Sequence, residues 1–423
     1  MTAYVAHVDI NNAYVSMARL FEPELVNKPV VILSNNDGAV VARSQEAKDL
    51  GIKMGDPWFQ LAANADRWGL IARSSNYEHI GNMHERVMTI LGRYTDRLGI
   101  YSVDEAFLEL HGTPPELHQL GRTIKAEILR LTGLPVSVGI AKTKVLAKLS
   151  TNAAKHIPEL SGVCVWDRAD PHTTEHLMSR LPAREIWGIG ERTAKRLEGI
   201  GIWTIKDLRD ADEIMIRDKF SIVQMRIVLE LRGVRCIPLE EPQEVKGQLI
   251  FSRAFSQPVT SRTGMEQVLG MYAQQAAAKL HRHQKQARLL TAWAMTSLHS
   301  NTTQHQPTIT VRLPGPSADP VVLTKAAKEL LPQILAGVRY ARAGIMLTDL
   351  RKRGQQPFLE PFVSAHEEKA IGPLIEEIRH RHGPHSLGLG LAGLRNAPEW
   401  QMRRDMLSPR YTTHWDELAT AYA

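Results

Sequence analysis

The chain has 423 residues, a formal net charge of +7 at pH 7 and a sequence pI of about 9.3. Apolar residues at 43% and charged residues at 23% are an ordinary soluble globular composition, and the length predicts several domains. No run approaches the roughly 18 apolar residues that a membrane span needs, and no basic region with an apolar core opens the sequence. We therefore expect a cytoplasmic protein without a secretory signal, whose two isolated cysteines are reduced thiols.

The first 165 residues or so mix strand-like and helical patterns, which indicates an α+β fold. Residues 3–10 predict a strand. Two apolar runs at 28–34 and 38–42 flank an Asn-Asn-Asp-Gly sequence, which predicts a hairpin. The other elements expected here are helices over 45–50, 77–94, 117–131 and 144–156 and strands over 99–102, 106–110, 135–141 and 162–166.

Short helices separated by glycine turns are expected between residues 167 and 233. A second α+β unit follows a linker rich in Pro, Glu and Gln. Its expected elements are strands over 289–296, 308–313 and 343–348 and helices over 265–281 and 324–335. Beyond residue 351, we expect a partly ordered tail.

The positive charge is concentrated in this second unit. Residues 245–353 contain fifteen Lys and Arg against four Asp and Glu, a net charge of +11, so the rest of the chain carries −4. Such an excess is typical of a module that lies along a phosphate backbone. A solvated basic face is the alternative that charge alone leaves open.

Three carboxylates are the candidate catalytic groups. Asp9 ends the first expected strand, and Asp104 and Glu105 stand at the tip of an expected hairpin. Groups placed in this way can converge, and their mutual repulsion favours bound cations with oxygen ligands. Two Mg²⁺ ions there would stabilise the attacking and leaving oxygens of an in-line phosphoryl transfer. An isolated Asp-Glu pair is more often a polar turn, and spacing alone leaves that reading open.

The sequence around these carboxylates resembles the Y-family translesion DNA polymerases. Residues 101–107 are similar to the catalytic hairpin of that family, and residues 9–14 to its N-terminal catalytic motif. Residues 28–33 match the strand that follows, residues 51–57 the fingers signature and residues 138–155 the palm helix. The order and spacing agree over about the first 235 residues.

One branch of that family is more similar than the rest. Residues 33–38, 54–59, 74–78 and 406–413 resemble the UmuC branch, which contains the catalytic subunit of bacterial DNA polymerase V and its plasmid-borne relatives. Because the tail motif at 406–413 has no role in the general family, it distinguishes the UmuC branch from the other Y-family polymerases. With it, the resemblance extends over nearly the whole chain.

The resemblance implies an α+β right-hand polymerase in several domains. These would be a ferredoxin-like palm (1–13 and 76–166), small fingers (14–75), a helical thumb with a helix-hairpin-helix (167–235), a linker (236–244), an α+β little finger (245–350) and a C-terminal tail for clamp and partner contacts (351–423).

The resemblance also implies a metal site. Asp9, Asp104 and Glu105 would be catalytic and would hold two Mg²⁺ ions, for which Mn²⁺ can substitute. The backbone carbonyl of Ile10 would be a further ligand.

Nucleotide contacts are implied for four side chains. Tyr14 matches the residue that crowds the sugar 2′ position and rejects ribonucleotides. Lys155 matches a lysine on the incoming triphosphate, and Arg43 and Lys48 stand where the fingers reach the triphosphate and base. Cations there would neutralise the charge that develops on the leaving pyrophosphate. Without the resemblance, the alternative for Lys155, Arg43 and Lys48 is an ordinary surface charge. For Tyr14 it is an ordinary half-buried tyrosine.

Three positions depart from the family pattern. Gln45 replaces an aromatic residue that often covers the nascent base pair, Lys48 replaces Arg, and Ala13 replaces a Phe that often precedes the sugar-gating tyrosine. These changes leave the metal site intact. They imply an open site, poor fidelity and tolerance of damaged templates.

The glycine-rich turn at 186–190 resembles part of a helix-hairpin-helix. Gly188 and Gly190 would present backbone N–H groups to a DNA phosphate, with Lys195 following. Glycines needed only for a turn are the alternative.

A sliding-clamp peptide is expected after the second unit. Gln355, Phe358 and Leu359 lie where the UmuC branch carries it, and they could fill two clamp pockets as an extended peptide. The match is degenerate, and a chance loop is the alternative.

The implied reaction is attack of a primer 3′-OH on the α-phosphate of a deoxynucleoside triphosphate, in DNA damage tolerance and the SOS response. Implied partners are primer-template DNA, a UmuD′-like accessory dimer, RecA and the sliding clamp, with no membrane. Two other functions stay open. One is a non-catalytic or partner-dependent DNA-binding paralogue, and the other is a nucleotide cyclase, which would consume nucleotide without a primer.

Overall fold

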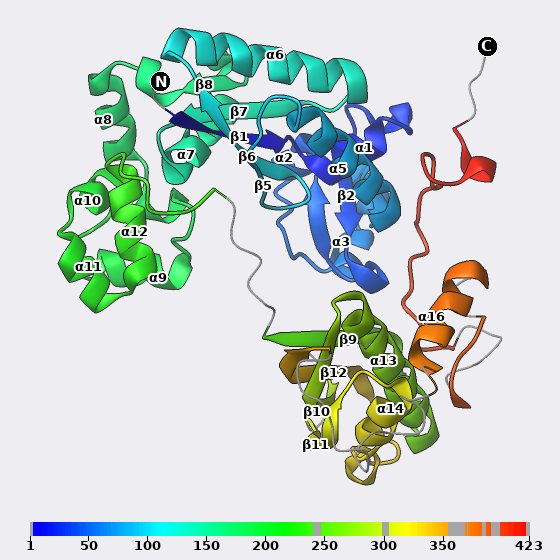
Figure 1. Ribbon diagram of the computed structural model, residues 1–423. Coiled ribbons are helices and arrows are strands. Elements are labelled where there is room, and N and C mark those ends of the chain that lie inside the picture. Colours follow the sequence, from blue (N-terminus) through cyan, green and yellow to red (C-terminus); the bar gives the residue numbers. More distant parts are fainter. Residues whose placement is uncertain are drawn as a thin grey trace. The chain divides into compact units, whose positions relative to one another are not determined.

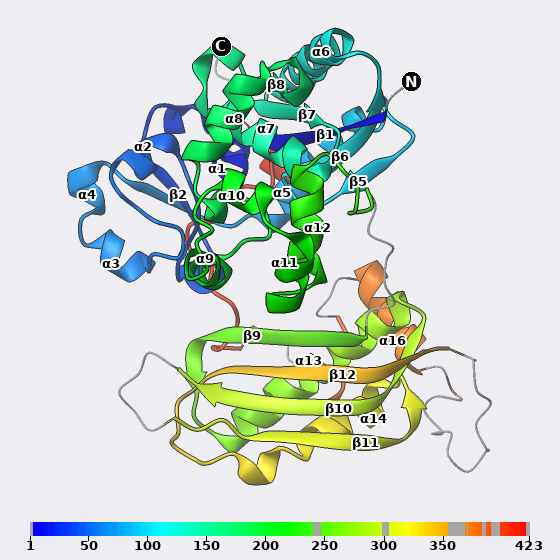
Figure 2. The same cartoon turned by 90° about the vertical axis from the view of Figure 1, so that its left-hand side faces the viewer.

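A computed structural model describes residues 3–239, 247–297, 304–353, 369, 371–382, 386–390 and 398–419 (Figures 1 and 2). They form two compact units. The first contains the described residues within 1–34, 38–242 and 406–423, and the second contains those within 35–37 and 243–405. None of the described helices combines the length and apolar character that crossing a bilayer requires.

A five-stranded sheet is the centre of the first unit. Its order is β5-β6-β1-β7-β8, with β1 antiparallel to both neighbours and β8 parallel to β7. The strands are β1 (Ala3–Ile10), β5 (Leu98–Ile100), β6 (Glu105–His111), β7 (Val136–Ala141) and β8 (Val163–Val165). The strands expected over 3–10, 99–102, 106–110, 135–141 and 162–166 correspond to these.

The two faces of this sheet are covered by different helices. Tyr4, Ala6 and Val8 pack in one core cluster with residues of α5 (Tyr77–Leu91) and α6 (Pro114–Thr132). Val5 belongs to another cluster, with residues of α7 (Lys144–His156). Because successive strand residues point to opposite faces, Val5, His7 and Asp9 share the α7 face. The alternation of the first strand therefore places Asp9 under α7.

The close approach of α7 to the sheet requires a glycine at position 139. A Cβ atom there would lie 2.2 Å from the backbone nitrogen of Thr151 and 2.3 Å from the carbonyl oxygen of Ala147. Both atoms belong to the α7 backbone, so no side-chain rotation relieves the contact. We expect Gly139→Ala to lower the free energy of unfolding by about 3 kcal/mol or more, measured by denaturant titration.

Gly190→Ala is the matched control for that substitution. Gly190 has φ of −81°, and an added Cβ would meet nothing within 4 Å. Equal stability of the two alanine variants would contradict the packing argument.

A smaller three-stranded sheet lies in the same unit. Its order is β3-β2-β4, with β2 (Val30–Leu33) antiparallel to β3 (Val40–Arg43) and parallel to β4 (Ile71–Ser74). The hairpin expected at the Asn-Asn-Asp-Gly sequence is thus formed. The helices of this region are α1 (Ala13–Arg19), α2 (Gln45–Asp49), α3 (Trp58–Ala62) and α4 (Ala65–Trp68).

Five short helices follow β8, as the glycine-punctuated sequence predicts. They are α8 (Pro171–Arg180), α9 (Glu191–Glu198), α10 (Ile205–Asp210), α11 (Glu213–Lys219) and α12 (Ile222–Leu231). Glu230 of α12 is fully buried, and it accepts backbone hydrogen bonds from Val145, Cys236 and Ile237. The bond from Val145 attaches the helical region to the N-terminus of α7, and the other two fix the chain that follows α12.

The second unit is a four-stranded antiparallel sheet, in the order β11-β10-β12-β9, packed with two helices. The strands are β9 (Gln248–Val259), β10 (Lys285–Thr296), β11 (Thr308–Ser317) and β12 (Tyr340–Lys352), and the helices are α13 (Arg262–Arg282) and α14 (Pro320–Lys328).

Two sequence predictions for this unit need correction. The strand β9 was not among the expected elements. As an edge strand it buries few side chains, so it lacks a clear alternating pattern. The helix expected over 324–335 ends at Lys328 and begins earlier, at Pro320. Asp319 caps it by accepting from two backbone N–H groups, and proline is favoured at this first position.

The tail beyond residue 351 contains α16 (Ile371–His382) in the second unit and a segment, 406–413, that packs on the first. Ser74 of β4 donates its backbone N–H to the carbonyl of Met406 at 2.9 Å. The ring of Tyr411 stacks on Phe21 with centroids 5.0 Å apart. The segment 406–413 is therefore integrated with the sheet edge at β4.

Candidate active site

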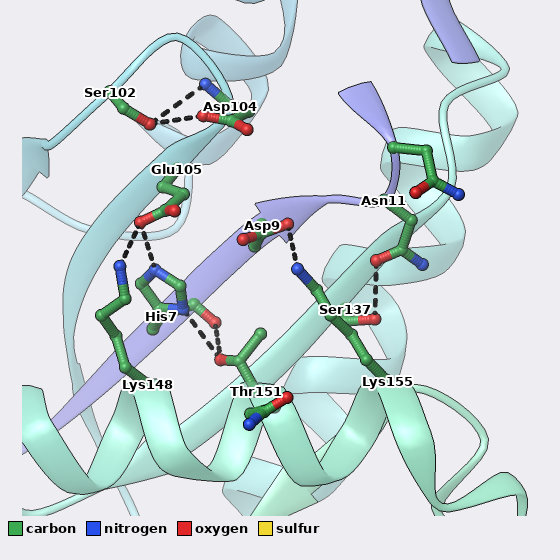
Figure 3. A network of polar contacts seen from close by, with 12 residues as sticks. His7, Asp9, Asn11, Ser102, Asp104, Glu105, Ser137, Lys148, Thr151 and Lys155 are labelled. Carbon is green, nitrogen blue, oxygen red and sulfur yellow. Dashed lines mark hydrogen bonds and ion pairs between the residues drawn. The ribbon is translucent and has the colours of Figure 1, made fainter. Parts of the chain in front are cut away.

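Of the three predicted carboxylates, Asp9 and Glu105 come together at the end of β1, and Asp104 directly precedes Glu105 in the chain. Asp9 stands directly opposite Glu105 in the register of β1 and β6. The backbone carbonyl of Asp104 accepts a hydrogen bond from the N–H of Ile10 at 2.9 Å. The Asp104 carboxylate accepts from the hydroxyl of Ser102 at 2.5 Å (Figure 3). The strand pairing thus brings Asp9 and Glu105 together, while the Asp104 carboxylate bonds to Ser102 and is not part of the cluster that Asp9 and Glu105 form with His7.

The environment shifts the pKa values of two of these groups in opposite directions. Burial raises the pKa of Asp9 to about 6 despite the Lys155 ammonium, and the charges of Glu105 and Asp104 add to the rise. Burial also opposes ionisation of Glu105. Hydrogen bonds from His7 and Lys148 outweigh it and lower the pKa of Glu105 to about 2. Glu105 is therefore an anion across the physiological range.

Two lysines of α7 neutralise these carboxylates. Lys155 Nζ lies 2.5 Å from Asp9 Oδ1, and Lys148 Nζ lies 2.5 Å from Glu105 Oε2. The lysines are seven residues apart, two helical turns, so they project from one face of the helix. Lys148 was not among the predicted site residues, although its spacing from Lys155 was a usable signal.

Aromatic rings enclose Lys148 on its other side. Its ammonium lies 4.8 Å from the ring centroid of Tyr101 and 5.5 Å from that of Trp187. The indole Nε1 of Trp187 donates to the hydroxyl of Tyr101 at 2.9 Å. The turn that contains Trp187 is thereby joined, through Lys148, to the carboxylate of Glu105.

The donor set suits a divalent cation. Oxygens of Asp9 and Glu105 and a ring nitrogen of His7 lie within 4.8 Å of one another. Clustered carboxylate oxygens are preferred ligands of hard cations. Ile10 ends β1 with its side chain buried in the core, so only its backbone carbonyl is a candidate ligand.

Three cations surround the approach to this site. Burial lowers the pKa of Lys48, and the charges of Arg43 and Lys155 lower it further, which places the three groups in one electrostatic environment. Lys48 donates to the side chain of Asn12 at 2.8 Å. The Nε atom of Arg43 is buried and has no hydrogen-bond partner within the described residues. An unsatisfied buried donor of this kind fits an anionic ligand.

Tyr14 lies in the first turn of α1 and is half-buried. Its pKa is raised by burial and by the nearby Tyr77 and Asp104. The ring is therefore close to the carboxylate end of the site. Gln45 donates to Asp49 within α2 at 2.9 Å, so its amide is engaged along the helix.

A cleft of about 260 Å³ opens beside these groups. Its lining includes Asp9, Lys155, Lys148, Trp187 and His7. Both α7 and the turn before α9 contribute to it. Asp9 is therefore accessible from the side of the helical region.

The predicted phosphate contacts lie in that region. Gly188 has φ of +91°, a conformation that favours glycine, and a Cβ atom there would meet Ile227 at 2.8 Å. Gly190 is the N-cap of α9. Lys195 pairs with Glu191 at 3.3 Å on the exposed face of the same helix. The predicted clamp residues Gln355, Phe358 and Leu359 lie outside the described residues.

Family models match three parts of the sequence. The impB/mucB/samB family matches residues 8–152, the C-terminal domain of that family matches residues 246–358, and a domain of unknown function matches residues 370–421.

Relatives of similar length are found among curated proteins. Protein UmuC of Salmonella typhimurium is 38% identical over 97% of this chain and 98% of its own length. Protein MucB of Escherichia coli is 37% identical over 98% of this chain and 99% of its own. DNA polymerase IV 1 of Bacillus subtilis is 30% identical over 56% of either chain.

Solved structures share the fold. A Y-family DNA polymerase chimera of Dbh and Dpo4 has a TM-score of 0.64 at 22% identity, over 83% of this chain and 100% of that chain. The insertion ternary complex of Dbh DNA polymerase has a TM-score of 0.53 at 21% identity and the same coverage. The expected α+β right-hand polymerase fold is confirmed.

Proposed function

The chain belongs to the impB/mucB/samB family, and from this membership we infer that it is a DNA-directed DNA polymerase that carries out error-prone translesion synthesis. The resemblance to the UmuC branch of the Y-family translesion DNA polymerases, which the sequence motifs indicate, is confirmed. Its substrate is DNA. The observation that carries the assignment within the molecule is the pairing of Asp9 with Glu105, next to Asp104.

We propose that these three carboxylates and the Ile10 carbonyl hold two Mg²⁺ ions. When bound, the ions supply charge neutralisation for the attacking 3′-OH of the primer and for the leaving pyrophosphate. Glu105 is ready for this role because its low pKa keeps it ionised. With a cation bound, Asp9 would exchange its Lys155 partner for that cation, and the ammonium would be free to meet a phosphate.

The other cations would bind the triphosphate. Lys155, Lys48 and Arg43 share one environment beside the carboxylates, and one buried donor of Arg43 lacks a partner within the described residues. Positive charge fixed there stabilises the leaving pyrophosphate without reorganisation. The ring of Tyr14 would form the wall that excludes a 2′-hydroxyl.

DNA would be held through its phosphates. The N-terminus of α9 with Gly188 and Gly190 offers backbone donors, and Lys195 adds charge nearby. The net charge of +11 over residues 245–353 supplies a second, sequence-independent contact. Binding should weaken as salt rises. In this scheme residues 1–13 and 76–166 are the palm, 14–75 the fingers, 167–235 the thumb and 245–350 the little finger.

The relatives named UmuC and MucB suggest the cellular partners. We propose a UmuD′-like dimer, a RecA filament and the sliding clamp, with Gln355, Phe358 and Leu359 as the clamp peptide. The setting would be tolerance of DNA damage in the SOS response.

The deciding experiment is primer extension across an abasic template with Mg²⁺. The full-length chain is assayed alone, and with a UmuD′-like dimer and RecA–ATP. We expect insertion opposite the lesion, at least with the partners present. Binding of the primer-template without extension in any lane would instead favour a non-catalytic DNA-binding protein. Consumption of nucleotide without primer would indicate a cyclase.

A further inference from the structure

His7 is a buried histidine that lies beside the carboxylates but was not among the predicted site residues. It stands between Phe107 of β6 and Gly139 of β7 in the strand register, on the α7 face of the sheet. Because Gly139 has no side chain, α7 approaches closely enough for Thr151 to reach the ring. Only 1% of His7 is exposed, so its ring nitrogens need partners inside the protein.

Both ring nitrogens have such partners (Figure 3). Nε2 lies 3.2 Å from Glu105 Oε2, and Nδ1 lies 2.9 Å from the hydroxyl oxygen of Thr151. An ionised carboxylate can only accept, so Nε2 carries a proton and donates it to Glu105. The Thr151 hydroxyl also lies 3.1 Å from the backbone carbonyl oxygen of His7 and 3.0 Å from that of Ala147, so it is held against both the ring and the α7 backbone. Thr151 thereby holds the ring at its Nδ1 edge, with Nε2 directed at Glu105.

We propose that His7 is a positioning residue for Glu105, held in its orientation by Thr151. His7 and Lys148 both donate to Oε2, at 3.2 and 2.5 Å. With Oε2 held by two donors, rotation of the carboxylate is restrained, and Oε1 is the oxygen presented to a cation. Lys148 supplies charge, and the fixed imidazole ring supplies direction.

This inference rests on the proposed function, because it concerns Glu105 as a metal ligand. Groups behind a ligating carboxylate fix its orientation, and removing one typically weakens metal binding by about 10- to 100-fold. The effect on DNA binding should be small, since His7 is buried under α7.

The alternative is that His7 is itself a ligand, since its ring belongs to the same cluster as Asp9 and Glu105. A ligating nitrogen must offer a lone pair to the metal. Here Nε2 faces a carboxylate and Nδ1 faces a hydroxyl. Ligation would break one of these bonds in a ring that has no exposed edge. The geometry therefore favours the positioning role.

The test compares His7→Leu, which removes the donor at similar volume, with His7→Gln, which keeps an N–H donor at the end of the side chain. Mn²⁺ binding is followed by its EPR signal, with the full-length chain saturated with primer-template DNA. The Mg²⁺ dependence of extension is measured in parallel. We expect His7→Leu to need about tenfold more of either metal, with unchanged KM for the nucleotide. His7→Gln should stay close to wild type.

Thr151 supplies an independent pair of variants if His7→Leu fails to fold. Thr151→Val should show part of the metal-binding loss, and Thr151→Ser should show none. Wild-type Mn²⁺ binding by His7→Leu or by Thr151→Val would overturn the proposal. Equal losses in His7→Leu and His7→Gln would also overturn it, in favour of ligation by the ring. An inactive wild type that still binds Mn²⁺ would count against the polymerase function, while the EPR comparison would still decide the role of His7.

Discussion

Replacing Asp104 by Asn should reduce kcat for nucleotide addition by about a thousandfold or more, which corresponds to about 4 kcal/mol in the activation barrier. The amide keeps the shape of the side chain and removes the negative charge that a divalent cation needs. The loss should appear in single-turnover extension of a primer with saturating dNTP. Affinity for primer-template DNA should hold or rise, because one negative charge near the phosphates is gone.

The control for Asp104→Asn is Asp96→Asn, which makes the same change at an exposed position of the same unit. Ser102→Ala is a graded variant, because it keeps the carboxylate and removes the hydroxyl that donates to it. Extension by Asp104→Asn at the rate of Asp96→Asn would remove Asp104 from the metal site.

Replacing Tyr14 by Ala should lower discrimination against ribonucleotides by about a hundredfold, since a pocket that loses a wall no longer rejects an added hydroxyl. The ring lies in the first turn of α1, near Asp104, where the sugar of an incoming nucleotide would lie in the proposed complex. The measurement is kcat/KM for a ribonucleotide and for the matching deoxynucleotide. The change should be confined mainly to the ribonucleotide.

Tyr14→Phe separates the ring from its hydroxyl. It should keep the discrimination of the wild type, because the proposed wall is the ring itself. If Tyr14→Ala selects sugars as the wild type does, another residue performs this task.

Local patterns predicted the elements around the site well. The first strand and α7 have the expected bounds, because the apolar run at 3–10 and the helical pattern at 144–156 are uninterrupted. The pairing of Asp9 with Glu105 depends on tertiary structure. Strand register joins residues far apart in the sequence, and only the family resemblance indicated it in advance.

The residues behind the carboxylates were harder to predict. His7 could have been found, because the alternation that puts Asp9 on one face puts His7 there too. Thr151 could not, since its contact depends on how closely α7 crosses Gly139. The edge strand β9 and the start of α14 at Pro320 were missed for a different reason. In each case a local feature, edge exposure or a capping Asp-Pro pair, outweighed the apolar periodicity.

The contact of Trp187 with Tyr101 and Lys148 has a thermodynamic consequence. The indole belongs to the turn that we propose for DNA phosphates, and Lys148 holds Glu105. Bound DNA would order this turn, and through Lys148 it would also order the Glu105 carboxylate. DNA binding and metal binding would then be linked equilibria. Linkage is reciprocal, so the factor by which DNA strengthens metal binding is the factor by which metal strengthens DNA binding. The polymerase would then hold a primer most firmly when its site is loaded, and would release it more readily when empty.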